Sequence, residues 1–226
     1  VRMPTKFTAD MSVEDATLMA KQLGTKHSTL PISDCFNSFL ECLEPEHGQL
    51  PHDTTEENIQ ARCRGVILMA ISNKSHYLLL TTGNRSELAV GYATLYGDMA
   101  GGFSALKDIY KTQAYDLANF INKEKTIIPQ RIIDRPPSAE LAEDQVDQDS
   151  LPPYEVLDII LSLYLDNEFS FKQIVDEGFN EDTVRKVLRM VDINEHKRRQ
   201  SPPGVRINHK AFGKDRRYPI TNGYRD

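Results

Sequence analysis

The sequence predicts an α/β fold in which parallel strands alternate with helices, and three observations support this class. Segments with the apolar spacing of amphipathic helices alternate with short apolar runs that are typical of strands. One such run, Tyr77 to Leu80, leads directly into the small and hydroxylated residues 81–84. Half of the twelve glycines lie between positions 65 and 102, where the backbone must turn sharply or lie close to a ligand. The alternation of strand and helix implies parallel pairing.

The first 75 residues are predicted to form three helices and one short strand. A capping-box-like pattern from Ser12 to Asp15 precedes a helix that Gly24 ends, and Ser33 is expected to cap a second helix. The third helix, from Thr55 to Ser72, carries a stripe of apolar residues at helical spacing. The remaining segments are a candidate strand over Thr29 to Ile32 and a loop over residues 44–53.

The second part of the chain is predicted to begin with a buried strand and to end in helices. Residues 77–81 form the strand, and a helix is expected from Lys111 to Glu124. Residues 134–153 are acidic and bounded by prolines, and this loop is too long for an ordinary connection, so it is a candidate lid. Three helices should follow, over Tyr154 to Asn167, Ser170 to Glu177 and Asn180 to Glu195. The final thirty residues are basic and show only a weak pattern.

Composition and charge exclude several classes of protein. The net charge is −6, but residues 197–226 hold nine basic and two acidic residues, so the rest of the chain is strongly acidic. That balance argues against general binding of nucleic acid, which requires net neutralisation of phosphate. No apolar run approaches the ~18 residues of a membrane span. The three cysteines, Cys35, Cys42 and Cys63, form no CxxC pair and are expected to be reduced, buried thiols of a cytoplasmic protein.

The end of the strand at 77–81 has the chemistry of a phosphate site. Backbone N–H groups and hydroxyl groups that follow a strand can bind phosphate. Thr82 supplies a hydroxyl there, and the carboxylate of Glu87 suits a magnesium ion beside phosphates. The alternative for Glu87 is an acidic residue that stabilises the first turn of a helix.

The amino-acid sequence of residues 78–103 resembles that of the ATP-dependent synthetase domain of glutamine-dependent NAD synthetases. The resemblance extends over nearly the whole chain, through the segments ENIQARCRG, IYKTQ, RPPSAEL, DQVDQDSLPPYEVLD and NEHKRRQSPPG. It implies a parallel-sheet domain of the adenine-nucleotide alpha-hydrolase-like (N-type ATP pyrophosphatase) class with a helical C-terminal group. It also implies ATP-dependent amidation of deamido-NAD to NAD through an adenylated intermediate, with nitrogen from ammonia or glutamine.

One departure from the family pattern affects the expected activity. The family's first phosphate-binding loop, SGGxDS, does not occur in these 226 residues. The resemblance therefore implies a synthetase domain truncated at its N-terminus, without the glutaminase domain of the glutamine-dependent enzymes, and this chain alone is expected to be inactive. Its expected parts are an α/β nucleotide-binding part (1–133), the acidic lid loop (134–153), a helical part (154–195) and a basic tail (196–226).

Four residues match family positions that contact ATP. They are Arg2, Thr82, Lys111 and Ser138, with the lysine near the phosphates. A lysine is a mobile point charge that suits a leaving pyrophosphate. The alternative for Lys111 is an exposed lysine in the first turn of a helix.

Four further residues match positions that the family uses for deamido-NAD: Asn58, Arg62, Glu87 and Lys197. Asn58 and Arg62 share one face of the long helix, where an amide and a guanidinium can hold a carboxylate or phosphate. Glu87 is also the expected magnesium ligand, and no residue is required as a covalent nucleophile. The alternative for the helix residues is a solvated face.

The resemblance also implies partners, while the basic tail leaves a competing function open. The expected ligands are deamido-NAD, ATP, Mg²⁺ and ammonia, in a homo-oligomer with no nucleic-acid or membrane partner. The alternative is a non-catalytic nucleotide- or RNA-binding module that uses the basic tail as its contact surface.

Overall fold

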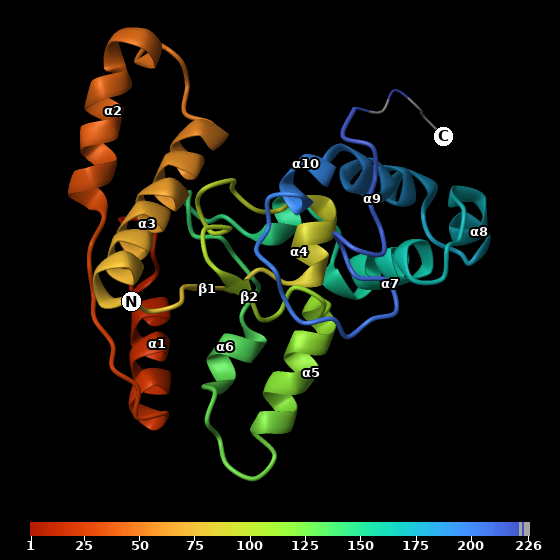
Figure 1. Cartoon of the computed structure of the whole chain (residues 1–226), viewed down its shortest axis with the longest axis horizontal. Coiled ribbons are helices and arrows are strands. Elements are labelled where there is room, and N and C mark those ends of the chain that lie inside the picture. Colours follow the sequence, from red (N-terminus) through yellow and green to blue (C-terminus); the bar gives the residue numbers. More distant parts are fainter. Residues whose placement is uncertain (222, 224–226) are drawn as a thin grey trace. The chain divides into compact units, whose positions relative to one another are not determined.

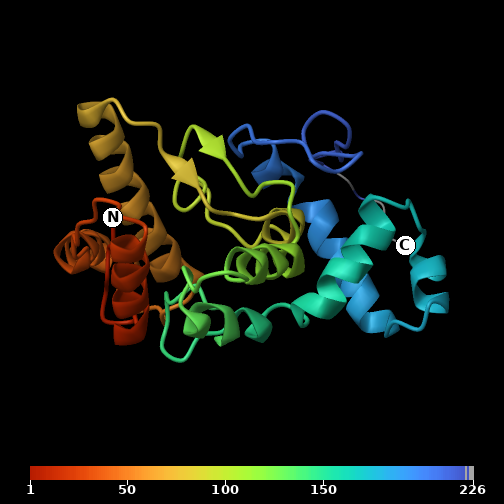
Figure 2. The same cartoon turned by 90° about the horizontal axis from the view of Figure 1, so that it is seen from below.

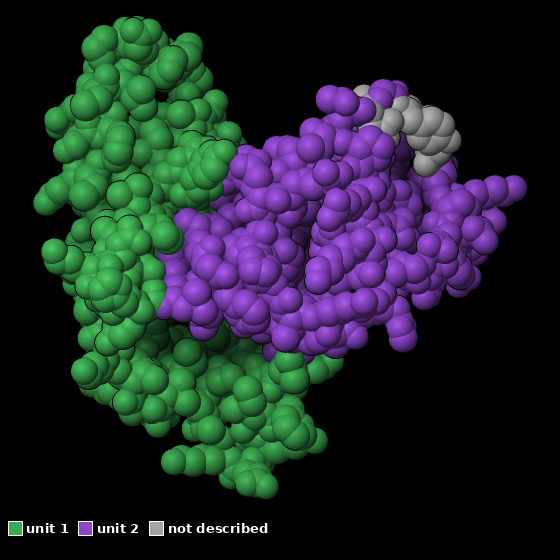
Figure 3. Space-filling view, viewed as in Figure 1, with its two compact units in different colours: residues 1–77, 96–98, 115–149 green, residues 78–95, 99–114, 150–226 purple. Residues whose placement is uncertain are grey.

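A computed structural model describes residues 1–221 and residue 223, so Arg225 of the basic tail lies outside the described residues. The chain divides into two compact units (Figure 3). Unit 1 consists of residues 1–77, 96–98 and 115–149, and unit 2 of residues 78–95, 99–114 and 150–226. The chain therefore passes between the units several times.

Unit 1 is helical. Its elements, drawn from red to green in Figure 1, are α1 (Asp10–Gln22), α2 (Ser33–His47), α3 (Thr54–Ser75), α6 (Gln130–Asp134) and the short 3-10 helix η1 (Asp147–Asp149). Helices α2 and α3 pack around a small apolar core made by Ile32, Phe36 and Cys63. Asp53 caps α3, because its side chain accepts the N–H of Thr55 at 2.7 Å while Glu56 accepts the N–H of Asp53 at 2.8 Å.

The start of α1 differs from the sequence-based prediction. The helix begins at Asp10, two residues before Ser12, and its N-cap, Ala9, makes no side-chain cap. Ser12 instead donates its hydroxyl to Glu140 at 2.6 Å, and Asp15 pairs with Arg131 of α6 at 2.8 Å. The polar residues that resembled a cap make tertiary contacts, and a local pattern cannot distinguish these two uses. Gly24 follows the helix with a φ of +63°, as predicted.

Two further predictions for this region were wrong. Ser33 is the first residue of α2 but makes no side-chain cap, and the helix continues through Pro45 to His47, so residues 44–47 are not loop. Cys35 and Cys42 are exposed, and only Cys63 is buried. Cys35 and Cys42 occupy exposed positions of α2, and a count of cysteines cannot reveal which positions of a helix are exposed.

Unit 2 combines a two-stranded sheet with a helical group. Its elements are β1 (Leu80–Thr81), α4 (Arg85–Val90), β2 (Phe103–Ser104), α7 (Tyr154–Leu165), α8 (Phe171–Asp176), α9 (Glu181–Ile193) and α10 (Glu195–Arg198). Helix α5 (Lys111–Ile121) begins in unit 2 and continues into unit 1. The core lies where α4, α7 and α9 meet, and Leu157, Ile160 and Val187 are completely buried there. The three predicted C-terminal helices are confirmed to within about two residues at each end.

The two strands pair in parallel, as predicted, with Leu80 opposite Phe103 and Thr81 opposite Ser104 (Figure 2). The strand is shorter than the predicted 77–81, and the prediction that it is buried was wrong. Tyr77, Leu78 and Leu80 are 72%, 66% and 54% exposed. Among the described residues, β2 is the only strand beside β1, so no third strand covers the apolar side chains of β1.

The acidic segment 134–153 contains little regular structure. It includes the end of α6 and carries η1. It contacts the rest of unit 1 through the Ser12–Glu140 bond and through the Gln60 side chain, which donates to the carbonyl oxygen of Leu141 at 2.8 Å. Within the segment, the N–H of the buried Asp147 donates to the carbonyl oxygen of Pro137 at 2.9 Å. Its role as a lid stays a prediction. None of the helices in the described part of the chain has the length and apolar character needed to span a bilayer.

Candidate functional site

The first turn of α4 is built around a reciprocal cap. The Asn84 side chain accepts the N–H of Glu87 at 3.0 Å, and the Glu87 carboxylate accepts the N–H of Asn84 at 3.1 Å. Such a cap satisfies two N–H groups that the first turn would otherwise leave without partners. The helix-capping role considered for Glu87 is therefore observed. The cap uses Oε2 of the Glu87 carboxylate, and the other oxygen, Oε1, faces α5.

Glu87 Oε1 meets Lys111, the first residue of α5. Lys111 Nζ lies 3.2 Å from Glu87 Oε1, and the two side chains are 21% and 18% exposed respectively. The ammonium also lies over the ring of Tyr154, 5.3 Å from its centroid. A carboxylate oxygen can accept more than one hydrogen bond, so the pair can also interact with a polar ligand. The structure thus brings together two predicted site residues that lie 24 positions apart.

Asp158 of α7 fixes the starts of both helices. Its carboxylate accepts the hydroxyl of Ser86, and it accepts the N–H and hydroxyl of Thr112 at 2.9 and 2.8 Å. The Ser86 hydroxyl oxygen in turn accepts the N–H of Lys111 at 2.9 Å. Asp158 is only 5% exposed, and its burial raises the pKa of the carboxyl above its ordinary value, while the three donors act in the opposite direction. The same buried carboxylate therefore holds the first turns of the two helices that carry the ion pair.

Sequence reasoning did not identify Asp158 or Ser86. Asp158 is a single carboxylate within an otherwise apolar stretch, VLDIILSL, and this isolation is the signal that marks it. A lone acid on a buried helix face must have donors nearby, because an unpaired buried charge is costly. The identity of those donors depends on the tertiary structure and could not be read from spacing.

Thr82 lies at the exposed end of β1, between the buried Thr81 and the cap residue Asn84. Gly101 belongs to the glycine-rich stretch in which the backbone was predicted to turn sharply or to lie close to a ligand, and here it lies close to the neighbouring strand. A Cβ on Gly101 would lie 2.7 Å from Thr81 Cγ2 and 3.0 Å from the carbonyl oxygen of Leu79. Gly101 therefore allows two backbone segments to pack closely beside the site.

Lys197 of α10 contacts the opposite end of α4. Its Nζ donates to the carbonyl oxygens of Gly91 and Ala93 at 2.7 and 2.8 Å. A cation at the last carbonyls of a helix is favourable, because those groups lack partners within the helix. The structure therefore gives Lys197 a helix-capping role. Its expected contact with deamido-NAD stays a prediction.

The other four predicted residues lie in unit 1. Asn58 is half-buried and Arg62 is exposed, one turn apart on α3. Ser138 donates its hydroxyl to the carbonyl oxygen of Gln145 within the acidic segment. Arg2 pairs in parallel with Thr29 and donates to the carbonyl oxygen of Val13 at 3.3 Å. The roles of these four residues in ligand binding stay predictions.

The described residues fit a magnesium ion that is held mainly by phosphates. In the described part of the chain, no three His, Cys, Asp or Glu side chains gather in a way that could hold a metal ion. Glu87 is a single, partly exposed carboxylate at the end of a strand. Mg²⁺ beside a nucleotide commonly uses one or two carboxylates, and water and phosphate oxygens complete its coordination. A single carboxylate at this place therefore suits that arrangement.

Comparison with known proteins places these features in a family. The chain is 53% identical over 227 residues to the glutamine-dependent NAD(+) synthetase of Acinetobacter baylyi and 50% identical over 228 residues to that of Thermotoga maritima. Each alignment covers 100% of this chain but only 42% and 40% of the respective relative. The chain thus spans about two fifths of the length of these curated relatives.

Solved structures agree with this comparison. The glutamine-dependent NAD+ synthetase of Acinetobacter baumannii, in complex with ADP, is 47% identical with a TM-score of 0.59, covering 98% of this chain and 40% of that chain. The enzyme of that type from Cytophaga hutchinsonii has a TM-score of 0.81 at 24% identity, covering 98% of this chain and 38% of that chain, which supports the fold alone. The family model described as NAD synthase matches residues 1–201, and the chain therefore belongs to the NAD synthase family.

Proposed function

We propose that the whole protein makes NAD by ATP-dependent amidation of deamido-NAD, with the nitrogen taken from ammonia or released from glutamine. The observation that carries this proposal is the Glu87–Lys111 pair at the starts of α4 and α5, next to the end of a parallel strand. The edge where parallel strands end and helices begin is the usual place for a nucleotide in an α/β fold. The relative from Acinetobacter baumannii binds ADP.

The proposed reaction has two steps. The nicotinate carboxylate of deamido-NAD attacks the α-phosphorus of ATP, and the bond to the leaving pyrophosphate breaks. Ammonia then attacks the carboxyl carbon of the adenylate, AMP leaves, and loss of a proton from nitrogen yields the carboxamide of NAD. Neither step requires a covalent bond to the protein. The task of the protein is to hold two anions together and to offset their charge.

The residues of unit 2 suit these tasks. Lys111 is held near the end of β1 by Glu87 and can turn its ammonium toward the phosphates of ATP. Thr82 offers a hydroxyl at the exposed strand end. Glu87 would hold Mg²⁺, which, when bound, offsets the negative charge of the phosphates. We assign Lys197 a contact to deamido-NAD in addition to its role at the end of α4.

The residues of unit 1 complete the proposed assignment. Asn58 and Arg62 would bind deamido-NAD, and Arg2 and Ser138 would bind ATP. Segment 134–153, which carries Ser138, is proposed as a lid that orders over the nucleotide and keeps water from the adenylate. We also propose that these 226 residues alone do not complete the reaction, because they contain no SGGxDS phosphate-binding motif.

The competing function, an RNA-binding module that uses the basic tail, has little support. Several of its cations are engaged within the protein. Arg198 is 3% exposed, Arg199 pairs with Glu195 at 2.7 Å, and Arg216 donates to the carbonyl oxygen of Leu165 at 2.8 Å. Internal pairing lowers the charge that the tail can offer to phosphate.

A reconstitution experiment tests the proposed function. The complete protein should form NAD and AMP when it receives deamido-NAD, ATP, Mg²⁺ and ammonia, and it should form neither when deamido-NAD is left out. Glutamine in place of ammonia identifies the nitrogen source. A folded, complete protein that forms no NAD with either nitrogen donor would refute the proposal.

A further inference from the structure

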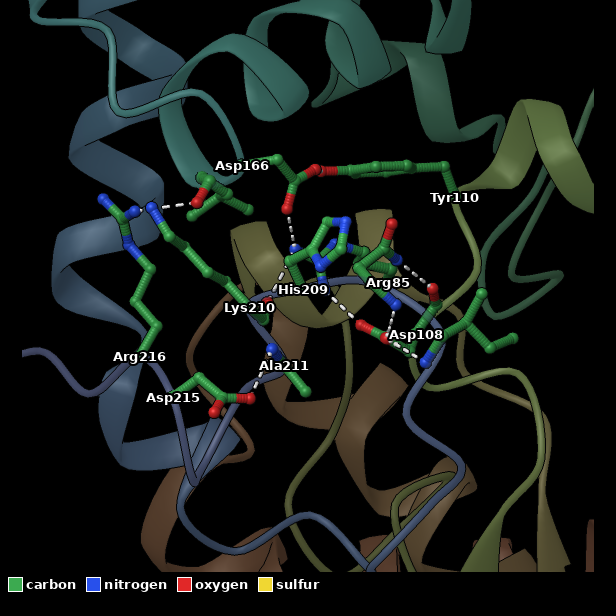
Figure 4. Close-up of polar contacts among 12 residues, drawn as sticks. Arg85, Asp108, Tyr110, Asp166, His209, Lys210, Ala211, Asp215 and Arg216 are labelled. Carbon is green, nitrogen blue, oxygen red and sulfur yellow. Dashed lines mark hydrogen bonds and ion pairs between the residues drawn. The ribbon is translucent and has the colours of Figure 1, made fainter.

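The start of α4 is attached to the C-terminal segment by a completely buried arginine. Arg85 is the first residue of α4, two positions before Glu87, and its side chain is 0% exposed (Figure 4). It pairs with Asp108 and, at 2.5 Å, with Asp166, and it donates to the carbonyl oxygen of Lys210 at 3.0 Å. A buried charge persists only where such partners compensate for the loss of water. The position of α4 is thus linked to all three.

Asp108 extends this link along the tail. Its second oxygen accepts the N–H groups of Ile207 and Asn208 at 2.7 and 2.6 Å. The Asn208 side chain donates to the carbonyl oxygen of Asp108 at 2.6 Å. One carboxylate therefore holds the arginine of α4 on one side and the backbone of the tail on the other. In Figure 4, dashed lines join Arg85 to Asp108, Asp166 and Lys210.

Aromatic rings close the remaining sides of the guanidinium. The rings of Tyr110 and Phe212 lie 5.2 and 5.1 Å from its central carbon. The Tyr110 hydroxyl donates to Asp166 at 2.7 Å, which fixes that carboxylate as well. An aromatic face attracts a cation, and the attraction is stronger where water is excluded. Phe212 comes from the tail, so the tail supplies both polar and apolar contacts to Arg85.

Two features indicate that the contacts of Arg85 orient helix α4. Helix α4 has only six residues, and a helix of that length takes its orientation from tertiary contacts rather than from its own hydrogen bonds. Residues 206–212 lie beyond residues 1–201, which the NAD synthase family model matches. A segment beyond the residues matched by that model therefore supports the helix that presents Glu87.

We propose that Arg85 is a positioning residue, which fixes the first turn of α4 to tail residues 206–212 through Asp108 and so holds Glu87 where it meets Lys111. The inference rests on the proposed function for its catalytic consequence. Its structural part, the coupling between the tail and α4, stands independently of that function. Loss of the coupling should lower the rate of the reaction and weaken the response to Mg²⁺ while the protein remains folded.

The test uses conservative changes in the complete protein. Arg85→Lys keeps the charge but loses the planar fork, and Asp108→Asn keeps the shape but loses the charge. Asn208→Ala removes only the side-chain donor from the tail and is the mildest variant. Arg185→Lys is the matched control, because Arg185 is 48% exposed and pairs with Glu181 on the surface of α9.

The expected result has two parts. Arg85→Lys and Asp108→Asn should lower kcat at least tenfold and raise the Mg²⁺ concentration for half-maximal rate, whereas Arg185→Lys should change neither. In hydrogen exchange, Asn208→Ala and Asp108→Asn should accelerate exchange both in residues 206–212 and in residues 85–90.

Two results would overturn the inference. One is a drop in melting temperature with an unchanged kcat and Mg²⁺ response per folded molecule, which would make Arg85 a structural residue only. The other is faster exchange in the tail with unchanged exchange in α4. If the unaltered complete protein forms no NAD, the proposed function fails, and the exchange measurement still decides whether tail and helix are coupled.

Discussion

At the scale of single residues, the site depends on carboxylates that hold other groups in place. Asp158 is nearly buried, and it accepts donors from the starts of two helices, α4 and α5. Neither helix contributes a carboxylate of its own to this contact. A buried acceptor shared in this way fixes the separation of Glu87 and Lys111 without touching either side chain.

We predict that Asp158→Ala destabilises the protein by about 1–3 kcal/mol, because the Ser86 hydroxyl and the Thr112 N–H lose their acceptor in a buried place. Denaturant titration of the variant measures this cost. Glu155→Ala is the control, since Glu155 is an exposed residue on the same helix and should shift the midpoint little. Equal midpoints for the two variants would show that Asp158 does not support the two helices.

The Arg131–Asp15 ion pair should make the stability of the protein depend on pH in the acid range. Arg131 donates to both oxygens of Asp15 at 2.8 Å and lowers the pKa of that carboxyl below its ordinary value of 3.8. A lowered pKa in the folded state means that the pair stabilises α1 and α6 above the ordinary pKa and is lost as the pH falls through the folded value.

The measurement compares the denaturation midpoints of the unaltered protein and Asp15→Asn at several pH values. The unaltered protein should be more stable at pH 7, and the difference should shrink as the pH drops below about 4. A difference that stays constant down to pH 3 would exclude the ion pair as its source.

At the scale of elements, the two ends of α4 are both fixed by residues from elsewhere in unit 2. Arg85 and the Asn84 cap hold its start, and Lys197 and Asn194 hold its end. Asn194 donates to the carbonyl oxygen of Val90 at 2.8 Å. The helix ends at Val90, and the next residue, Gly91, has a φ of +72° and no room for a side chain, since a Cβ would lie 2.1 Å from the Asn194 side chain.

We predict that Gly91→Ala destabilises the protein more than Gly178→Ala. Both glycines have a positive φ, but a Cβ on Gly178 meets nothing within 4 Å. The control should therefore cost only the left-handed conformation, about 1–2 kcal/mol, and Gly91→Ala should add the steric clash. Thermal unfolding of both variants checks the order. Equal losses would mean that Asn194 moves aside without cost.

The tail shows how pattern and structure differ at this scale. Its basic residues and lack of periodicity predict a weakly structured surface. It does contain little regular structure, yet Ser104 pairs with Gly204, Asp108 holds Ile207 and Asn208, and Phe212 is buried. Irregular segments that are fixed by single side chains leave no periodic signal, so sequence reasoning could not place them.

At the scale of the whole chain, the sequence predicted the helices well and the sheet poorly. Residues 154–193 form amphipathic helices whose apolar faces meet one core, and such faces are visible in sequence. The exposure of Tyr77 and Leu78 depends instead on which segments lie beside β1. An apolar run shows that a strand can be buried but not whether neighbours cover it.

The candidate site also contains residues that the sequence predicted and residues that only the structure reveals. Glu87 and Lys111 were predicted from a family resemblance and do meet, whereas Asp158 and Arg85 became visible only through their contacts. Both missed residues are buried charged side chains with polar partners. Their partners lie tens of positions away, in segments whose proximity only the fold determines.

The central claim is that the complete protein activates deamido-NAD by adenylation at the Glu87–Lys111 pair. Exchange of labelled pyrophosphate into ATP measures the reverse of that step directly. We predict that label enters ATP only when deamido-NAD and Mg²⁺ are present. Glu87→Gln and Lys111→Met should each slow the exchange by about tenfold or more, the effect of losing a charge-assisted contact. Lys214→Met, at an exposed tail position, should leave it unchanged. Exchange that proceeds without deamido-NAD, or at the same rate in Glu87→Gln, would contradict this account.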